Sequence, residues 1–190
     1  MTKFIPHHHY KGDNLSRSEK VERRIIELII TSKIPDSQRE SSVVWELKHS
    51  SGCLQIARIL SEKRKLDIEL SEIASVLHDI YVIIHGTYKN HAKLGAPIAE
   101  KLLIEIGGFT KYEIATITSA IAHHSEKDIY TDDPYIELVK DADVFDCSLY
   151  KGAEGDYRIN KPTPVFKEYV KRIQKVRREL GMPTDKVFRT

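Results

Sequence analysis

The 190-residue chain has few cysteines: it holds two, Cys53 and Cys147, and no C-x-x-C pair. Two cysteines are too few for the disulfide framework of a small secreted domain. The missing pair also argues against a structural zinc knuckle. A domain of this length can bury about 70% of its extended-chain surface, so its core needs no cross-links. We therefore expect a protein of the reducing cytoplasm.

Long apolar runs are also missing. No stretch approaches the roughly 20 apolar residues that span a bilayer, and residues 1–6 lack the apolar centre of a secretory signal. The sequence thus predicts neither a membrane segment nor a signal peptide. The formal net charge is only +2, so overall charge gives no general argument for nucleic-acid binding.

The chain shows no convincing alternating strand pattern and no internal repeat. Apolar residues instead recur at helical spacing in several segments. We predict helices over about 16–33, 41–63, 67–83, 89–106 and 114–124, a sixth from Pro134 through at least Phe145, and a last one over 165–180. Residues 152–164 are expected to form a loop. The predicted class is all-α, a single helical bundle of about six or seven helices.

The expected organisation is one domain with extensions at both ends. Residues 1–15 are a lead-in whose histidines, 7–9, we expect to be solvated. Residues 16–155 form a metal-binding helical domain, and 156–190 a loop and a basic amphipathic helix packed on it. From Arg158 onward there are ten Lys/Arg and three Asp/Glu. We interpret this charge as a solvated face, with a partner or phosphate contact as the alternative.

One polar pair interrupts the apolar run over residues 74–84. His78 and Asp79 lie side by side in its middle. Burying a carboxylate costs several kcal/mol, roughly, unless the group is paired or coordinated. The pair therefore predicts a metal ion bound by His78 and Asp79, with other ligands from elsewhere in the chain.

Further candidate ligands lie on neighbouring predicted helices. Six of the nine histidines fall between residues 49 and 124, and two aspartates lie on the next helix. Side chains from packed helices can converge in a bundle, although the ligands lie far apart in sequence. Imidazole and carboxylate ligands suit one or two divalent ions such as Mn, Fe, Co, Ni or Zn.

The ordered set His49, His78-Asp79, Asp143 resembles the H…HD…D signature of the HD-domain superfamily. The resemblance covers about residues 41–150 and extends to further stretches along the chain. They are Leu77-His78-Asp79-Ile80, His91-Ala92-x-x-Gly95-Ala96, Ala120-Ile121-x-x-His124 and Asp141-Ala142-Asp143. The resemblance implies an all-α core and, for most members, metal-dependent phosphohydrolase activity.

The resemblance also implies which residues hold the metal. His49, His78, Asp79 and Asp143 would form the shared site, with His78 and Asp79 at the catalytic centre. His91 and His124 match the additional histidines of two-metal members. The alternatives are His123 in place of His124 and Asp141 in place of Asp143.

The sequence departs from common subfamilies at several points. Tyr81 stands where many members have Gly, and the lysine that often follows is missing. No Gly-Tyr-Pro follows His123-His124, which argues against the cyclic-dinucleotide phosphodiesterases. No Glu-Asp follows shortly after His78-Asp79, which argues against the alarmone hydrolases.

The function that this resemblance implies is hydrolysis of a phosphate ester, as a phosphomonoesterase or phosphodiesterase. The expected substrate is a nucleotide or another small phosphorylated molecule. Lys93, Lys140, Lys151 and Arg158 are candidate cations for its charge. The alternatives are a di-iron oxygenase on the same ligand set and a non-catalytic metal- or nucleotide-binding regulatory module. The sequence leaves the oligomeric state open.

Overall fold

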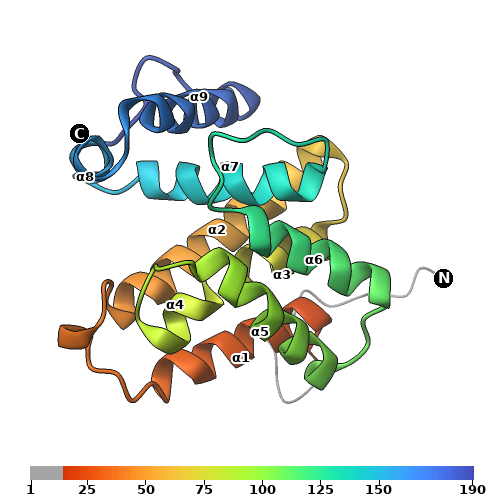
Figure 1. The fold of residues 1–190 in the computed structure, drawn as a ribbon. Coiled ribbons are helices and arrows are strands. Elements are labelled where there is room, and N and C mark those ends of the chain that lie inside the picture. The colour runs from red at the N-terminus through yellow and green to blue at the C-terminus, as the bar shows by residue number, and fades with distance from the viewer. Residues whose placement is uncertain (1–14) are drawn as a thin grey trace.

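The computed structural model describes residues 15–190 and shows a helical bundle (Figure 1). Residues 1–14, including the three histidines of the lead-in, lie outside the described part. Within residues 15–190 there is no strand, which confirms the all-α class. The described helices are α1 (Arg17–Ile30), η1 (Asp36–Gln38), α2 (Val43–Arg64), α3 (Ile68–Leu77), α4 (Ile80–His85), α5 (His91–Ile106), α6 (Lys111–His123), α7 (Pro134–Ser148), α8 (Ala153–Asn160) and α9 (Thr163–Glu179). None of them is both long and apolar enough to cross a membrane.

Local capping signals fix where several helices begin. Both α1 and α6 begin with a capping box, and in α6 the Thr110 hydroxyl and the Glu113 carboxylate each accept from the other's backbone N–H. Asp133 caps α7, with Pro134 at its first position. These side chains accept hydrogen bonds from N–H groups that lack partners within the helix. The structure thus confirms the predicted starts of α1 and α7, whereas α6 begins at Lys111, earlier than the predicted residue 114.

The prediction of one continuous helix over residues 67–83 is wrong. The chain leaves helical geometry at Asp79, which has φ −103° and ψ 22°, so α3 ends at Leu77 and α4 begins at Ile80. Neighbouring side chains on a regular helix point about 100° apart. The turn instead brings His78 Nε2 to 3.3 Å from Asp79 Oδ2. The apolar pattern did not reveal this break because it continues through both helices.

The prediction of a loop over residues 152–164 is also wrong, because α8 occupies most of this segment. None of its residues is buried, so it lacks the apolar face by which helices are recognised in a sequence. The break at Asp79 and the additional α8 raise the number of α-helices described to nine, above the expected six or seven.

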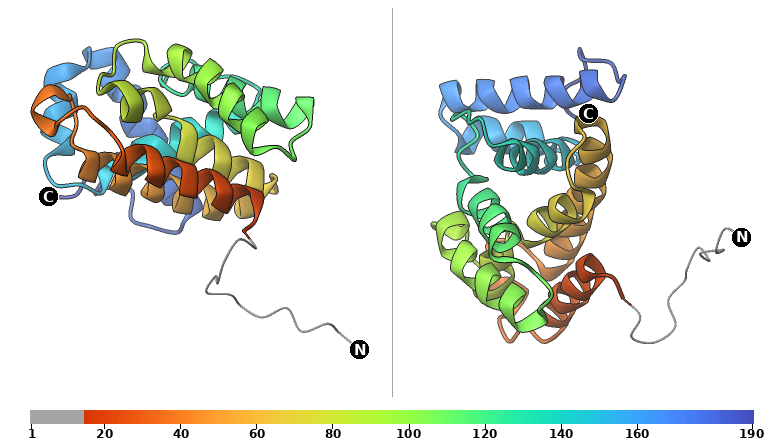
Figure 2. Two further views of the ribbon diagram at one scale, coloured as in Figure 1. Left: turned by 90° about the horizontal axis from the view of Figure 1, so that it is seen from below. Right: turned by 90° about the vertical axis from the view of Figure 1, so that its right-hand side faces the viewer.

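The central helices hold the site, and α9 covers one end of the bundle. Helix α3 packs against α1, α2, α6 and α7, and α2 also packs against α7. Helix α9 lies across α7, away from α1 (Figure 1), and Figure 2 shows the same layering from two other directions. The elements from α2 to α7 therefore meet around one interior point.

Candidate metal centre

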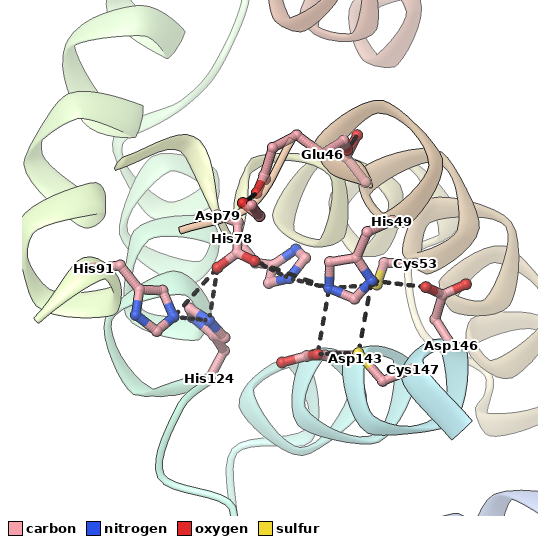
Figure 3. Close-up of polar contacts among 12 residues, drawn as sticks. Glu46, His49, Cys53, His78, Asp79, His91, His124, Asp143, Asp146 and Cys147 are labelled. Atoms are coloured by element: carbon pink, nitrogen blue, oxygen red, sulfur yellow. Dashed lines mark hydrogen bonds and ion pairs between the residues drawn. The ribbon is translucent and has the colours of Figure 1, made fainter. Parts of the chain in front are cut away.

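Four imidazoles from different elements converge on the carboxylate of Asp79 (Figure 3). His91 Nε2 lies 3.2 Å and His124 Nε2 3.4 Å from Asp79 Oδ1. His78 Nε2 lies 3.3 Å and His49 Nε2 3.9 Å from the other oxygen, Oδ2. The two oxygens of one carboxylate thus face two pairs of imidazoles.

Three of these imidazoles are oriented in the same way. Nδ1 of each histidine lies 2.7 Å from the carbonyl oxygen of the residue three positions earlier. The pairs are His78 with Ser75, His91 with Tyr88, and His124 with Ile121. A carbonyl oxygen only accepts, so Nδ1 carries the proton and Nε2 keeps its lone pair. This contact is typical of histidines that bind metals through Nε2.

His49 is oriented by a carboxylate that the sequence interpretation missed. Its Nδ1 lies 2.7 Å from Oδ2 of Asp146, which is buried on α7. Gly52 leaves the space for that carboxylate: a Cβ at this position would lie 2.0 Å from Asp146 Oδ1. The position of Asp146 three residues after Asp143 was the signal available in the sequence, because it places both on one face of α7.

The Nε2 atoms face one another in a way that fits bound cations. His49 Nε2 lies 3.2 Å from His78 Nε2, and His91 Nε2 lies 3.0 Å from His124 Nε2. With Nδ1 protonated, each pair brings two acceptor lone pairs together, which is unfavourable unless a cation or a proton lies between them. Asp79 Oδ1 is buried without a hydrogen-bond partner. A metal ion would satisfy all of these atoms.

The donors form two adjacent groups that share Asp79. Asp143 Oδ1 lies 3.4 Å from His49 Nε2, so Asp143 belongs with His49 and His78. His91 and His124 form the second group. Among the described residues, the sets that could hold an ion are His49–Cys53–His78, His49–Asp143–Cys147 and His78–Asp79–His124. The two cysteines therefore lie beside His49.

The protonation of the cluster is linked to metal binding. Burial, assisted by the nearby Lys127 charge, lowers the pKa of His124 to about 4, so its imidazole is neutral at pH 7. Burial alone would raise the pKa of Asp143, but Lys127 and the neighbouring imidazoles hold it well below its ordinary value. Burial lowers the pKa of His78, yet the Asp79 carboxylate raises it above normal overall. Protons and metal ions therefore compete for this cluster.

The structure separates the alternatives left open by the sequence. His123 has its side chain 46% exposed and pairs with Glu126 at 2.8 Å, whereas His124 is buried in the cluster. Asp141 is fully buried but points elsewhere. Its carboxylate binds Arg172, Arg64 and Lys175 at 2.9, 2.8 and 2.7 Å. His124 and Asp143 are the members of each pair that face the other candidate ligands.

A cavity of about 860 Å³ opens beside the cluster and includes His49, Asp79, His91, His124 and Asp143 in its lining. Of the predicted cations only Lys151 lines it. Lys93 is exposed, Lys140 binds Ile129 O and Glu137, and Arg158 pairs with Glu154. Lys127 and Lys161, which the sequence interpretation missed, are the other lysines of the lining. The rings of Trp45, Tyr88, Tyr150, Tyr157 and Tyr169 form much of the rest.

A comparison with known families now identifies the class. The family model of the HD domain matches residues 47–147, more than half of the chain. The chain therefore belongs to the HD-domain family. The matched range holds all six predicted ligands, from His49 to Asp143.

Known proteins of two kinds resemble the chain. Three proteins named ribonuclease Y, from Chlorobium phaeobacteroides, Chlorobium phaeovibrioides and Chlorobium luteolum, are 29%, 31% and 32% identical over 109 to 110 residues. These matches cover 57% of this chain but only 19% of each relative. The crystal structure of a predicted HD superfamily hydrolase from an uncultured Thermotogales bacterium aligns with a TM-score of 0.55. It is 21% identical, and the alignment covers 86% of this chain and 91% of that one, so it supports the fold.

Proposed function

We propose that the protein is a metal-dependent phosphohydrolase acting on a nucleotide or another small phosphate ester. The observation that carries the proposal is the arrangement around Asp79. Four imidazoles, each fixed through Nδ1, direct Nε2 toward one shared and partly unpartnered carboxylate. Membership of the HD-domain family supports the same class of reaction.

We assign the ligands according to the two groups of donors. His49, His78, Asp143 and Asp79 Oδ2 would hold one ion, and His91, His124 and Asp79 Oδ1 a second. A divalent ion bound there would act as a Lewis acid on the phosphoryl group and provide activated water. The chain's own part is to fix these donors, and His78 and Asp79 form the centre because Asp79 belongs to both groups.

The cavity supports a substrate of small-molecule size. Its volume of about 860 Å³ lies within the range of ordinary ligand pockets. Three lysines in its lining favour an anionic ligand, and five aromatic rings provide surfaces for a planar group such as a base. Because the curated relatives are named ribonuclease Y, short RNA also belongs among the substrates to be tried.

The proposal is tested by assaying the purified protein, loaded in turn with Mn, Fe, Co, Ni and Zn, on nucleotides, dinucleotides, simple phosphate esters and short RNA. We expect at least one metal to support release of phosphate or a cleaved ester. Asp79→Ala should lower kcat/KM by at least about 1000-fold, because both groups of donors lose their shared ligand. Metal content per chain is measured in parallel.

Asp132→Ala, which replaces an exposed aspartate outside the cavity lining, is the matched control and should retain activity. Hydrolysis of nothing in the panel with any metal would overturn the proposal, as would full activity of Asp79→Ala. Oxygen uptake by the iron-loaded protein, with no hydrolysis, would instead identify the oxygenase chemistry.

A further inference from the structure

A lysine that the ligand set does not include lies directly beside it. Lys127 follows His124 by three residues, in the turn after α6. Its residue surface is only 2% exposed, yet it lines the cavity together with His124 and Asp143. A lysine is almost never buried to this degree unless its charge is paired.

Its ammonium group is only partly satisfied by the protein. Nζ donates to the carbonyl oxygen of His124 at 2.5 Å and forms a close ion pair with Asp143 Oδ2. An ammonium has three N–H donors, and within residues 15–190 these are its hydrogen-bond acceptors. These two acceptors leave one N–H of the ammonium without a partner among the described residues, in a side chain that lines the cavity. Asp143 is thus shared, with Oδ1 toward His49 and Oδ2 toward Lys127.

The turn that carries Lys127 is fixed from outside the cluster. Arg172 of α9, itself fully buried, donates through Nε to the backbone oxygen of Lys127 at 2.6 Å and through Nη2 to that of Ile129 at 3.2 Å. The same guanidinium pairs with Asp141 and Glu137. A backbone held in this way positions the ammonium, whereas an exposed lysine would have to be ordered at an entropic cost.

No cation reaches the cluster from the helix that follows Asp79. Helix α4 contains no lysine or arginine, and its Ile80 and Val82 are fully buried. The cavity's other lysines, Lys151 and Lys161, lie on the turn before α8 and at its end. Of the three cavity lysines, Lys127 is therefore the nearest in sequence to a candidate ligand, His124. It also contacts a second candidate ligand, Asp143.

We infer that Lys127 binds a phosphoryl oxygen of the substrate beside Asp143, a role that rests on the proposed phosphohydrolase function. Its free N–H would donate to an oxygen that also faces the ions. A charge-assisted hydrogen bond of this kind is short and directional. Lys127 would thus fix the orientation of the phosphoryl group relative to Asp79.

The experiment measures binding of inorganic phosphate to the metal-loaded protein by calorimetry, which requires no turnover. Lys127→Met should weaken phosphate binding about 10- to 100-fold, as expected for loss of one charged hydrogen bond. Lys127→Arg should restore part of it. Lys140→Met is the matched control, since Lys140 is fully buried and binds the same turn at Ile129 O, 2.7 Å away, but does not line the cavity.

Metal content and melting temperature are measured for every variant. Unchanged phosphate affinity in a metal-loaded Lys127→Met protein would overturn the inference. Loss of metal from Lys127→Met, with normal phosphate affinity once metal is saturating, would also overturn it and make Lys127 a residue that only orients Asp143. If no ester is hydrolysed but phosphate binding still depends on Lys127, the proposed function fails while the binding role stands.

Discussion

Two walls of the same cavity are built in opposite ways. On one side His49, His78, Asp79 and His124 are at most 5% exposed, and every imidazole is fixed by a backbone oxygen or a carboxylate. On the other side α8 has no buried residue and lies between α7 and α9. The wall that carries the candidate ligands is therefore rigid, whereas α8 depends on few packing contacts.

The face that α8 turns to the cavity is mixed: Asp156 and Asn160 are polar, whereas Ala153 and Tyr157 are partly buried against the core. Ala153, Asp156, Tyr157 and Asn160 line the cavity at the spacing of one helical face, and the Asn160 amide donates to Asp156 at 2.8 Å. Ile159, at 83% exposed, points to solvent. Under the proposed function, we expect the wall of candidate ligands to carry the chemistry and α8 to contribute to substrate selection.

The largest effect that would sharpen this comparison is expected at Asp146. Asp146→Ala removes the group that orients His49, so metal affinity should fall about 10- to 100-fold. Asp146→Asn keeps an oxygen acceptor for Nδ1–H and should lose less. The measurement is competition for metal with a chromogenic chelator. Wild-type affinity in Asp146→Ala would show that the ligand wall does not depend on this support.

A smaller effect is expected on the other wall. Asn160→Ala removes one polar group from the cavity, which should raise KM about 2- to 10-fold, the value of one hydrogen bond. Metal content and melting temperature should not change, because Asn160 is exposed and contacts no ligand. Ile159→Ala on the opposite face of α8 is the control. A fall in metal content with Asn160→Ala would contradict the separation of the two walls.

The smallest effect is expected outside both walls. Arg17 binds Glu113 and Glu69 and lowers the pKa of Glu113 to about 2 from 4.5. Because the folded-state pKa is depressed, the stabilisation is present above pH 4.5 and is lost as the pH falls toward 2.

Glu113→Gln retains a side-chain acceptor for the capping box but loses the charge. It should lower the free energy of unfolding by about 1 kcal/mol at pH 7, with a difference that shrinks in acid. Urea titration at several pH values measures this. Metal affinity and KM should stay as in the wild type. A change in either would contradict the expectation that Glu113 affects only the stability of the fold.

Where several helices begin could be predicted from the local sequence. Ser16, Thr110 and Asp133 carry their capping role in the few residues that follow them, and each of the three caps its helix. The break at Asp79 could not be predicted in the same way, because the apolar pattern of α3 continues into α4. Helix α8 was missed for the opposite reason, since it buries no apolar face.

The residues of the candidate site also differ in whether the sequence reveals them. His78-Asp79 could be named from the sequence because a polar pair in an apolar run is visible without a fold. His49, His91, His124 and Asp143 could be named because their order resembles the HD-domain signature. The roles of Asp146 and Lys127 could not. Asp146 reaches His49 across 97 residues of sequence, and the turn that carries Lys127 is held by Arg172 of α9, 45 residues further along the chain.

The sequence by itself determined the all-α class, the family resemblance and the candidate ligands, because helical periodicity, capping and residue type act over a few neighbouring positions. Only the tertiary structure decided which oxygen of Asp79 faces which imidazoles, that His124 rather than His123 and Asp143 rather than Asp141 face the cluster, and that α8 lines the cavity. These outcomes depend on the packing of α2, α5, α6 and α7 around α3 and α4. Distances between helices are set by that packing and have no local signal in the chain.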